Sequence, residues 1–383
     1  MTRVAVIGRG LIGAAAARYL AKAGHETLLI GPDEPTNNAS YEGPFGSHYD
    51  EARITRRLDP NPFWSKVAEA SIARYPNIEI EGDARFYIAA GALMTGPGDE
   101  AMVRGIRKTQ AVIGDQTPEL DRTALSERFG FLAFPEGTVG FHETKSAGYV
   151  NPRRLLLAQC NAAQMHGANI VRHPVGRITE MHNGVQLEID NGIVEMDQVL
   201  VAAGAYTNSL LPDPLDLTVY ARTVALLEVG TAESARLCKM PSMVYRFPDG
   251  RDPYLLPPIP YPDGRTYLKI GGDPENLVLE TATEIGAWLR SGGNMEVATY
   301  LAGIAKEIIP GLAIKNLRAA ACPVMFTSTG LPYIDRITSR ISVATGGCGA
   351  GAKCSDELGR LGAEAVQGRV QPELKTKFKG IRT

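Results

Sequence analysis

The sequence Arg3-Val-Ala-Val-Ile-Gly-Arg-Gly-Leu-Ile-Gly13 decides the fold. Residues 3–7 form a short, apolar, β-branched run that predicts a buried parallel strand. The Gly-x-Gly-x-x-Gly pattern follows without a gap, and the alanine-rich residues 14–23 predict a helix that ends near Gly24. Residues 27–30 predict a second strand. The segment is therefore a βαβ unit, the context in which this glycine pattern indicates dinucleotide binding.

Each glycine of the pattern has a separate role in this hypothesis. Gly8 permits the tight turn, Gly10 lets the backbone approach a pyrophosphate, and Gly13 lets the helix pack closely on the strand. The phosphates are expected at the start of the helix, at Leu11 and Ile12, where free N–H groups and the helix dipole favour anions. The alternative is a glycine-rich turn in some other α/β protein.

The acidic residue that should bind the ribose is displaced. Such a residue ends the second strand about 20 residues after the glycines, but Gly31-Pro32 stands there. Asp33 or Glu34 takes its place in our prediction, and Asp33 ranks first.

The rest of the chain alternates between predicted strands and helices without an internal repeat, which indicates an α/β fold. We expect an extended loop over 36–50, helices over 61–75, 151–167, 284–309 and 355–366, and strands over 168–171, 199–203 and 341–345. Residues 221–275 are strand-like and interrupted by prolines. The basic run 375–379 is expected to be a solvated tail.

Composition excludes several classes of protein. The 383 residues are 44% hydrophobic and 21% charged, with a formal net charge of −2 and a pI near 6.3, which gives no electrostatic footprint for nucleic acid. No stretch approaches the roughly 18 apolar residues of a membrane helix, and no signal peptide precedes residue 3. We therefore expect a cytoplasmic protein, monomeric or homodimeric, without membrane partners. The five cysteines form no C-x-x-C pair, so neither zinc nor a disulfide framework is predicted.

Four further segments, in order along the chain, resemble the monomeric sarcosine oxidase and N-methyltryptophan oxidase family. They are Gly46-Ser-His-Tyr-Asp-Glu-Ala-Arg-Ile-Thr-Arg56, Tyr267-Leu-Lys-Ile-Gly271, Leu317-Arg-Ala-Ala-Ala-Cys322, with Ile334-Asp335 shortly after it, and Thr345-Gly-Gly-Cys-Gly-Ala-Gly-Ala-Lys-Cys-Ser355. The resemblance spans nearly the whole chain. It implies FAD as the cofactor, a small amine or amino acid as the substrate and O2 as the oxidant, with no metal.

The resemblance also implies the domain organisation. An FAD-binding, Rossmann-like domain of the glutathione-reductase type is expected from residues 1–85, 145–220 and 315–383. It is interleaved with a mixed-sheet α+β substrate domain from residues 86–144 and 221–314.

Several site residues follow only from the resemblance. Ser47 and His48 lie in the flavin-contacting loop, and Arg53 lies beside the flavin ring. Arg56 and Lys353 hold the substrate carboxylate, for which two parallel bonds from Arg and a point charge from Lys are suited. The alternative for these cations is solvation or ion pairing with Asp50 and Glu51.

Two residues carry the redox expectations of the resemblance. Cys322 is implied to bind the flavin covalently through sulfur, and the alternative is a buried structural cysteine. Lys269 is implied to stabilise superoxide as it forms from O2, and the alternative is an outward-facing lysine on a half-exposed strand.

The closing loop is implied to lie against the flavin. Gly346, Gly347, Gly349 and Gly351 let the backbone approach the ring, and the helix that follows stabilises negative charge on it. The alternative is a glycine hinge before a packing helix, with Ser355 as its N-cap.

Departures from the family pattern bear on the substrate. Asp273 and Ala350 stand where the family often has a histidine, and Val324 stands where it has a tyrosine. Tyr254, in contrast, matches a tyrosine of the family's substrate pocket. The resemblance as a whole implies oxidation of the C–N bond of a secondary or N-substituted amino acid, with hydride transfer to flavin N5 and H2O2 as product, whereas the altered pocket residues favour a biosynthetic oxidase slightly. A flavin-dependent dehydrogenase, a biosynthetic oxidase of a larger imine or amine, and a nucleotide-binding protein without redox chemistry stay as alternatives.

Overall fold

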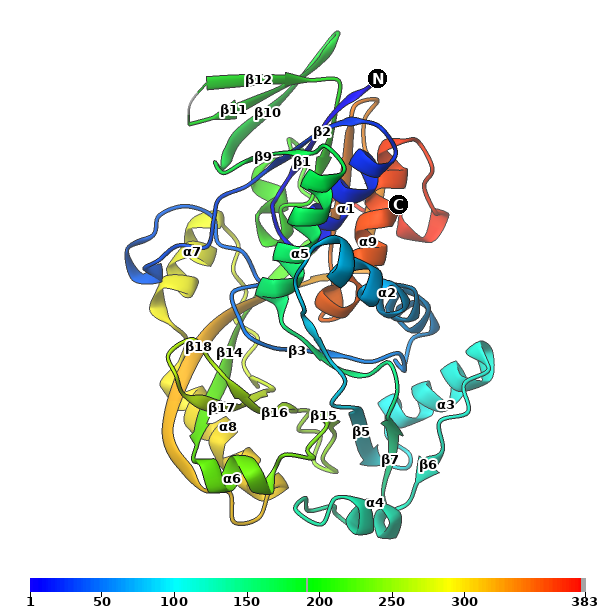
Figure 1. The fold of residues 1–383 in the computed structure, drawn as a ribbon, viewed down its shortest axis with the longest axis vertical. Helices are drawn as coiled ribbons and strands as arrows, with labels where there is room; N and C mark the ends of the chain where they lie inside the picture. Colours follow the sequence, from blue (N-terminus) through cyan, green and yellow to red (C-terminus); the bar gives the residue numbers. More distant parts are fainter. Residues whose placement is uncertain (191, 380–383) are drawn as a thin grey trace.

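The computed structural model describes residues 1–190 and 192–379, and they form two halves built on two large sheets (Figure 1). The upper half in this view contains the six-stranded sheet, and the lower half contains the eight-stranded sheet. The strands of the first sheet, in spatial order, are β19 (Tyr333–Arg336), β20 (Ile341–Thr345), β13 (Gln198–Val201), β1 (Arg3–Ile7), β2 (Glu26–Ile30) and β9 (Asn169–Val171).

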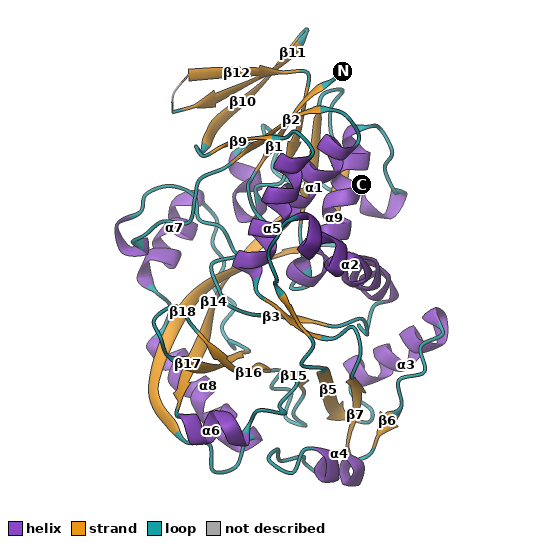
Figure 2. Cartoon of the chain, in the orientation of Figure 1, coloured by secondary structure: helices purple, strands orange, loops and turns teal. Residues whose placement is uncertain are grey.

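The first sheet confirms the predicted parallel βαβ unit. Strand β1 lies between β13 and β2 and is parallel to both, while β19 is the antiparallel edge strand. Residues 4–7 are buried, as the apolar run predicts. Parallel strands of this kind are covered by helices on their faces, and Figure 2 shows the helices gathered beside this sheet. They are α1 (Leu11–Lys22), α2 (Pro62–Glu81), α5 (Pro152–Met165) and α9 (Gly351–Val366).

The second sheet is mixed. In spatial order it contains β18 (Ile314–Thr327), β14 (Leu217–Val229), β17 (Thr266–Gly271), β16 (Tyr254–Pro260), β15 (Ser242–Tyr245), β5 (Ala92–Pro97), β7 (Thr138–Glu143) and β6 (Glu119–Leu120). Around it lie α3 (Ala101–Ile113), α4 (Arg122–Arg128), α6 (Thr231–Arg236), α7 (Ala282–Ser291) and α8 (Met295–Ile308). Two three-stranded sheets complete the strands. One is β10 (Val175–Met181), β11 (Gly184–Ile189) and β12 (Gly192–Met196), and the other is β3 (Arg53–Thr55), β8 (Gly148–Val150) and β4 (Tyr87–Ile88).

The strands of the two large sheets can be compared with the segments of the two predicted domains. Each of the three predicted FAD-binding segments contributes two strands to the six-stranded sheet. The exact boundaries stay a prediction, because β18 belongs to a predicted FAD-binding segment and yet pairs along its length with β14 in the other sheet.

Three local predictions were wrong. The helix predicted over 284–309 is two helices, because Gly292 adopts a left-handed φ of 76° and ends α7. The last helix begins at Gly351 and not at Ser355. The basic run 375–379 is not a free tail: Lys377 accepts a hydrogen bond from the backbone of Asp216, and Phe378 packs against a buried apolar cluster.

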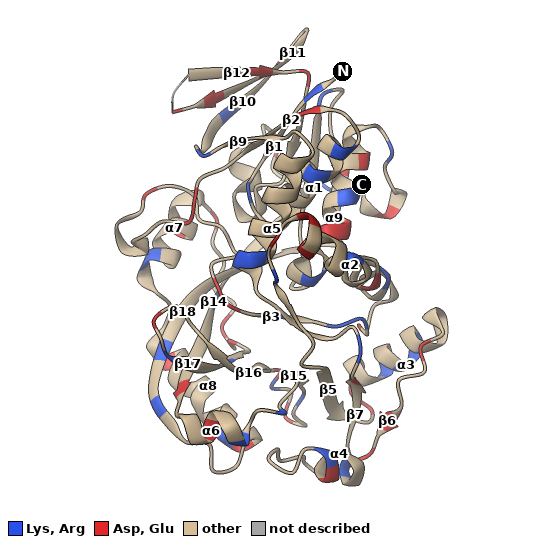
Figure 3. Ribbon diagram, in the orientation of Figure 1, with Lys and Arg blue, Asp and Glu red and all other residues tan. Residues whose placement is uncertain are grey.

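Charge is distributed evenly over both halves. Basic and acidic segments are scattered across the ribbon in Figure 3 and do not separate into regions of one sign. Among the described helices, none has both the length and the apolar character needed to cross a membrane. Within residues 1–190 and 192–379, no cluster of His, Cys, Asp and Glu is arranged to hold a metal ion.

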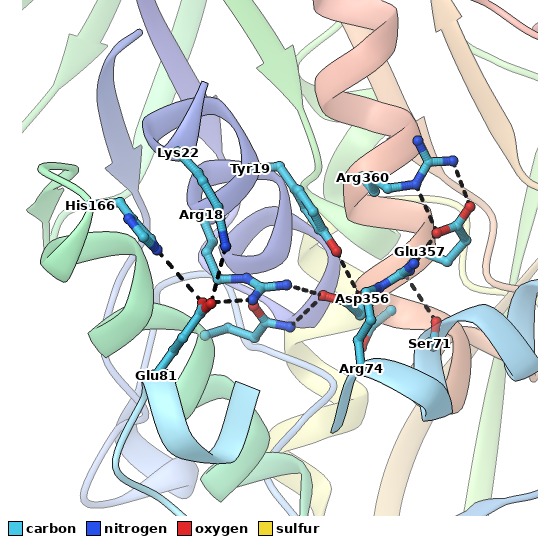
Figure 4. Close-up of polar contacts among 12 residues, drawn as sticks. Arg18, Tyr19, Lys22, Ser71, Arg74, Glu81, His166, Asp356, Glu357 and Arg360 are labelled. Atoms are coloured by element: carbon cyan, nitrogen blue, oxygen red, sulfur yellow. Dashed lines mark hydrogen bonds and ion pairs between the residues drawn. The ribbon is translucent and has the colours of Figure 1, made fainter. Parts of the chain in front are cut away.

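A buried carboxylate joins the helices of the upper half (Figure 4). Asp356 of α9 is fully buried and accepts hydrogen bonds from Arg18 at 2.7 Å and from Arg74 at 2.6 Å. Tyr19 and Gln159 donate to the same carboxylate, each at 3.0 Å. Four helices from distant parts of the chain, α1, α2, α5 and α9, therefore meet at one side chain.

Replacing Arg18 with Met tests this junction. Arg18 is only 3% exposed, so its removal leaves Asp356 with less positive charge in a dry environment. Removing one partner of a buried ion pair costs about 3–5 kcal/mol. We expect Arg18→Met to lose about 3 kcal/mol of stability in urea denaturation. A change below about 0.5 kcal/mol, the usual range for surface substitutions, would contradict the structural role, and Lys66→Ala on the exposed face of α2 is the control.

Candidate functional site

A cavity of about 930 Å³ lies at the carboxyl ends of the central strands of the six-stranded sheet. Ligands of open α/β sheets bind at this edge. The predicted residues that line it are Gly8, Gly10, Leu11, Ile12, Ser47, His48, Arg53, Cys322, Gly346, Gly347, Gly349 and Gly351. The structure thus brings together residues from the first 55 positions, the long strand β18 and the start of the last helix.

Two helices direct uncapped N-termini at this cavity. Helix α1 starts after Gly10 and α9 after Ala350, and neither has a side chain that caps its first turn. In contrast, a side chain caps α2, α3, α4, α5, α7 and α8. The six-residue helix α6 also lacks a side-chain cap, but its residues do not line the cavity. The first N–H groups of a helix need a partner, so α1 and α9 leave theirs available to a ligand with negative charge.

The glycine turn fits a dinucleotide. Gly8 has a φ of 108°, and a Cβ there would lie 2.3 Å from the carbonyl oxygen of Ala202. A Cβ at Gly13 would lie 2.0 Å from the carbonyl oxygen of Gly8, so both positions require glycine. At Gly10, a Cβ would meet no protein atom within 4 Å, which leaves the space on the cavity side free for a diphosphate.

Asp33 follows the end of β2 but does not line the large cavity in the described chain. It forms ion pairs with Arg9, inside the glycine turn, and with Arg172. Burial acts to raise the pKa of Asp33, but the hydrogen bonds from Arg9 and Arg172 outweigh it and lower the pKa. Asp33 is therefore ionised and fixed at the strand end. Its contact with a ribose stays a prediction.

His48 is neutral at physiological pH. The ring is buried, and burial lowers its pKa to about 3, with Arg9, Arg153 and Arg53 adding to the effect. Within the described residues, its buried Nδ1 has no hydrogen-bond partner. Because a buried polar atom is normally satisfied, this nitrogen is a further sign that the cavity takes a ligand with polar groups.

Arg53 connects the cavity to a buried cluster. Its guanidinium donates to the thiol sulfur of Cys322 at 3.9 Å and to the carbonyl oxygen of Ser47 at 3.2 Å. It also forms an ion pair with Asp50, the pairing that the sequence left open as an alternative. Cys322 is a free, partly exposed thiol on the cavity wall, so it is not the buried structural cysteine of the alternative hypothesis.

Lys269 lies in the buried cluster and is 1% exposed, which excludes an outward-facing surface lysine. Its ammonium group forms an ion pair with Asp50 and donates to the carbonyl oxygen of Ala52 at 3.0 Å. Burial lowers the pKa of Lys269 well below its usual value, and Arg53 lowers it further, while contact with the Asp50 carboxylate works in the opposite sense. Tyr254 packs beside this cluster, with its ring centroid 5.9 Å from the ammonium nitrogen. Its pKa is raised to about 12, mainly by burial.

Arg56 and Lys353 converge, although they are almost 300 residues apart. Both contact the same oxygen of Asp59, Arg56 at 3.2 Å and Lys353 at 3.0 Å. Lys353 directly follows Ala352, which lines the cavity. Neither Arg56 nor Lys353 is among the described residues that line the cavity. The two cations form one basic point, with Asp59 bound to both.

Asp59 and Glu143 are the residues of this region that sequence reasoning missed. Glu143 is buried and accepts hydrogen bonds from the backbone N–H groups of Arg57 and Leu58. The sequence held one usable signal: Asp59 follows Arg56 by three residues, and a buried cation needs a counter-ion. No comparable signal marks Glu143, which comes from a strand of the other sheet.

Comparison with known proteins agrees with this geometry. The family model described as FAD dependent oxidoreductase matches residues 3–365. Among curated relatives, N-methyl-L-tryptophan oxidase of Salmonella newport is 23% identical over 98% of this chain and 97% of its own length. The enzyme of the same name from Yersinia pestis is 24% identical over 96% and 95%.

Solved structures share the fold. NikD, described as an unusual amino acid oxidase essential for nikkomycin biosynthesis, aligns with a TM-score of 0.78 and 19% identity over 99% of this chain and 98% of its own. Fructosyl amine: oxygen oxidoreductase (Amadoriase I) from Aspergillus fumigatus aligns with a TM-score of 0.75 and 19% identity over 98% and 88%.

A negative charge at Gly10 should prevent cofactor binding without disturbing the fold. Gly10→Glu places a carboxylate in open space where the diphosphate is expected, so repulsion replaces attraction. We expect flavin affinity to fall about tenfold or more, measured by reconstitution of the apoprotein with FAD. The matched control is Gly303→Glu, because Gly303 of α8 also has no atom within 4 Å of its Cβ direction. Equal flavin content in the two variants would show that the glycine turn does not hold the diphosphate.

Proposed function

Since this chain belongs to the family of FAD-dependent oxidoreductases, we propose that it oxidises the C–N bond of a secondary or N-substituted amino acid. Curated relatives that align over nearly their whole length are named for the oxidation of an N-methylated amino acid. Two proteins of the same fold are described as an amino acid oxidase and a fructosyl amine oxidoreductase. An N-substituted amine is the chemistry that these names have in common.

One observation carries the substrate side of the proposal. Arg56 and Lys353, which come from opposite ends of the chain, meet at one oxygen of Asp59, and Lys353 directly follows Ala352 of the cavity lining. Two cations at one point, of which Lys353 is buried and Arg56 partly buried, suit the carboxyl end of an amino acid, because Arg and Lys form strong hydrogen bonds with its oxygens. The amine and its substituent would then extend along the cavity wall.

A bound FAD would supply the redox chemistry: acceptance of a hydride from the carbon attached to the amine nitrogen, and reoxidation by O2 to give H2O2. The protein residues have positioning and electrostatic roles. The uncapped starts of α1 and α9 would hold negative charge at two points of the cofactor. Arg53 on the cavity wall and Lys269, which shares Asp50 with it, would supply positive charge, and a cation assists the reaction of O2.

A second candidate is a dehydrogenase that passes electrons to another acceptor. The observation that favours it is the ion pair between Lys269 and Asp50, because a neighbouring carboxylate offsets the positive charge that would assist O2. Measurement of H2O2 per substrate consumed under air separates the two. One H2O2 per turnover supports the oxidase, and turnover that needs an added dye supports the dehydrogenase.

We further propose a thioether between the Sγ of Cys322 and the 8α-carbon of the flavin. Forming this bond removes the thiol hydrogen and one methyl hydrogen, and O2 takes up both as H2O2. Support comes from the position of the free thiol on the cavity wall, next to the Arg53 guanidinium. The sulfur of a cysteine is the nucleophile in reactions of this kind.

Acid precipitation tests the attachment. We expect yellow colour to stay with the precipitated wild-type protein and with Cys348→Ser, and to move to the supernatant for Cys322→Ser. Cys348 is the matched control because it is also a free cysteine on the cavity wall. Colour in the supernatant of the wild-type protein would mean that FAD is held without a covalent bond.

The substitution Arg56→Ala tests whether Arg56 binds the carboxyl end of the substrate. Hydrogen bonds to charged groups contribute about 1.5–3 kcal/mol, so Arg56→Ala should raise KM for an N-methyl amino acid by roughly tenfold to a hundredfold. Lys66→Ala, an exposed cation of α2, should leave KM unchanged. Steady-state kinetics measure both. An unchanged KM in Arg56→Ala would remove Arg56 from the substrate site.

A further inference from the structure

Among the described residues that line the cavity, four carry a formal charge: Arg9, Arg53, Arg290 and Glu42. Two of the three cations already have a counter-ion, because Arg9 pairs with Asp33 and Arg53 pairs with Asp50. Arg290 differs from them, since no carboxylate of residues 1–190 or 192–379 lies within ion-pair distance of it. Glu42 is exposed to solvent. Arg290 therefore supplies the uncompensated positive charge of the cavity wall.

Arg290 lies in the last turn of α7, and its guanidinium is placed on the cavity side of the helix. Its Nη1 donates to the carbonyl oxygen of Tyr41 at 3.1 Å. A Cβ at Gly286, one turn earlier, would lie 3.1 Å from the same nitrogen, so this glycine leaves room for the guanidinium. Gly286 and Arg290 both line the cavity. An arginine has five N–H donors, and only one of them has an acceptor among the described residues.

The wall that contains Arg290 is continuous with the glycine turn. Helix α7 packs against the 3-10 helix η2 (Gly204–Ser209) and against η1 (Asn38–Ser40) in the loop after β2, and Figure 1 shows α7 beside this loop. Immediately before η2, the carbonyl oxygen of Ala202 would lie 2.3 Å from a Cβ at Gly8. Arg290 and the start of α1 therefore belong to neighbouring parts of one cavity wall.

A diphosphate needs more positive charge than the glycine turn provides. It carries two negative charges, whereas a helix start contributes about half of one positive charge. The guanidinium of Arg9 is directed away to the carbonyl oxygens of Gly31 and Pro32 and to Asp33. His48 is neutral, because burial lowers its pKa to about 3. A charged group in a partly closed cavity requires a partner of opposite charge.

Arg290 has the chemistry that this ligand requires. A guanidinium can form two parallel hydrogen bonds with phosphate oxygens, and it stays charged at every physiological pH. We infer that Arg290 binds the diphosphate of FAD together with the start of α1. The inference concerns the cofactor and holds whichever substrate the protein oxidises.

Two substitutions at Arg290 separate charge from a merely structural role. Arg290→Gln can still donate to the carbonyl oxygen of Tyr41 but has no charge, whereas Arg290→Lys keeps the charge. Both are made in a Cys322→Ser background, so that FAD can be removed and titrated back into the apoprotein. We expect Arg290→Gln to raise the dissociation constant of FAD about tenfold to a hundredfold. Arg290→Lys should recover most of this loss, since lysine also binds phosphate.

The matched control is Arg122→Gln in the same background. Arg122 also donates to one backbone carbonyl, that of Phe134 at 2.8 Å, and it too lacks an ion pair within the described chain. It does not line the cavity, so its substitution should leave the dissociation constant unchanged. If Arg290 only held the loop through Tyr41, the glutamine and lysine variants would lose affinity equally.

Phosphorus NMR of the bound FAD provides a second readout, which requires no apoprotein and is also possible when the flavin is attached to Cys322. We expect at least one of the two phosphate resonances to shift in Arg290→Gln, and neither to shift in Arg122→Gln. Three results would overturn the inference: a dissociation constant within twofold of the background in Arg290→Gln, equal losses in the glutamine and lysine variants, or unchanged phosphate resonances.

Failure of the proposed function would be recognised separately. An N-methyl amino acid is mixed with the holoenzyme without air, and loss of visible flavin absorbance is followed. Absence of bleaching, together with the expected order of FAD affinities, would reject amine oxidation and preserve the role of Arg290.

Discussion

The hydrogen-bonded carboxylate of Asp356 is the interaction on which the upper half of the molecule depends. It joins α1, which begins at the glycine turn, to α9, which carries Lys353 one helical turn earlier. Gly359 lets the two helices approach, since a Cβ there would lie 2.5 Å from the Cβ of Ala15. The same contact therefore fixes the relative position of the two uncapped helix starts that face the cavity.

Paired carboxylates determine how much positive charge the site retains. Asp50 pairs with Arg53 and Lys269, and Asp59 pairs with Arg56 and Lys353. Two carboxylates thus accompany four buried or half-buried cations. A cation in a dry site has a high desolvation cost that a nearby carboxylate reduces. The electrostatic field at the cavity is consequently set by these pairs and not by the number of basic residues.

Local sequence predicted the βαβ unit well, because its strands are continuous apolar runs and its turn requires glycine at Gly8 and Gly13. The break at Gly292 was missed although the sequence contains a signal for it, because Gly292-Gly293-Asn294 is a run of turn-forming residues inside the predicted helix. The partners of the cations were harder to find. Glu143 reaches Leu58 from a strand of a different sheet, and hydrophobic periodicity contains no information on such a contact.

The contact between the first helix and the last also constrains how the protein is made. Ribosomes add roughly 5–20 residues per second, so α1 emerges on the order of tens of seconds before α9. Throughout that interval the alanine-rich face of α1 lacks its final packing partners. This face includes Ala14–Ala17, which are buried in the folded protein. The cavity is likewise open on one side until Gly346–Gly351 is synthesised. The cavity wall is therefore complete only when almost the whole chain has been synthesised.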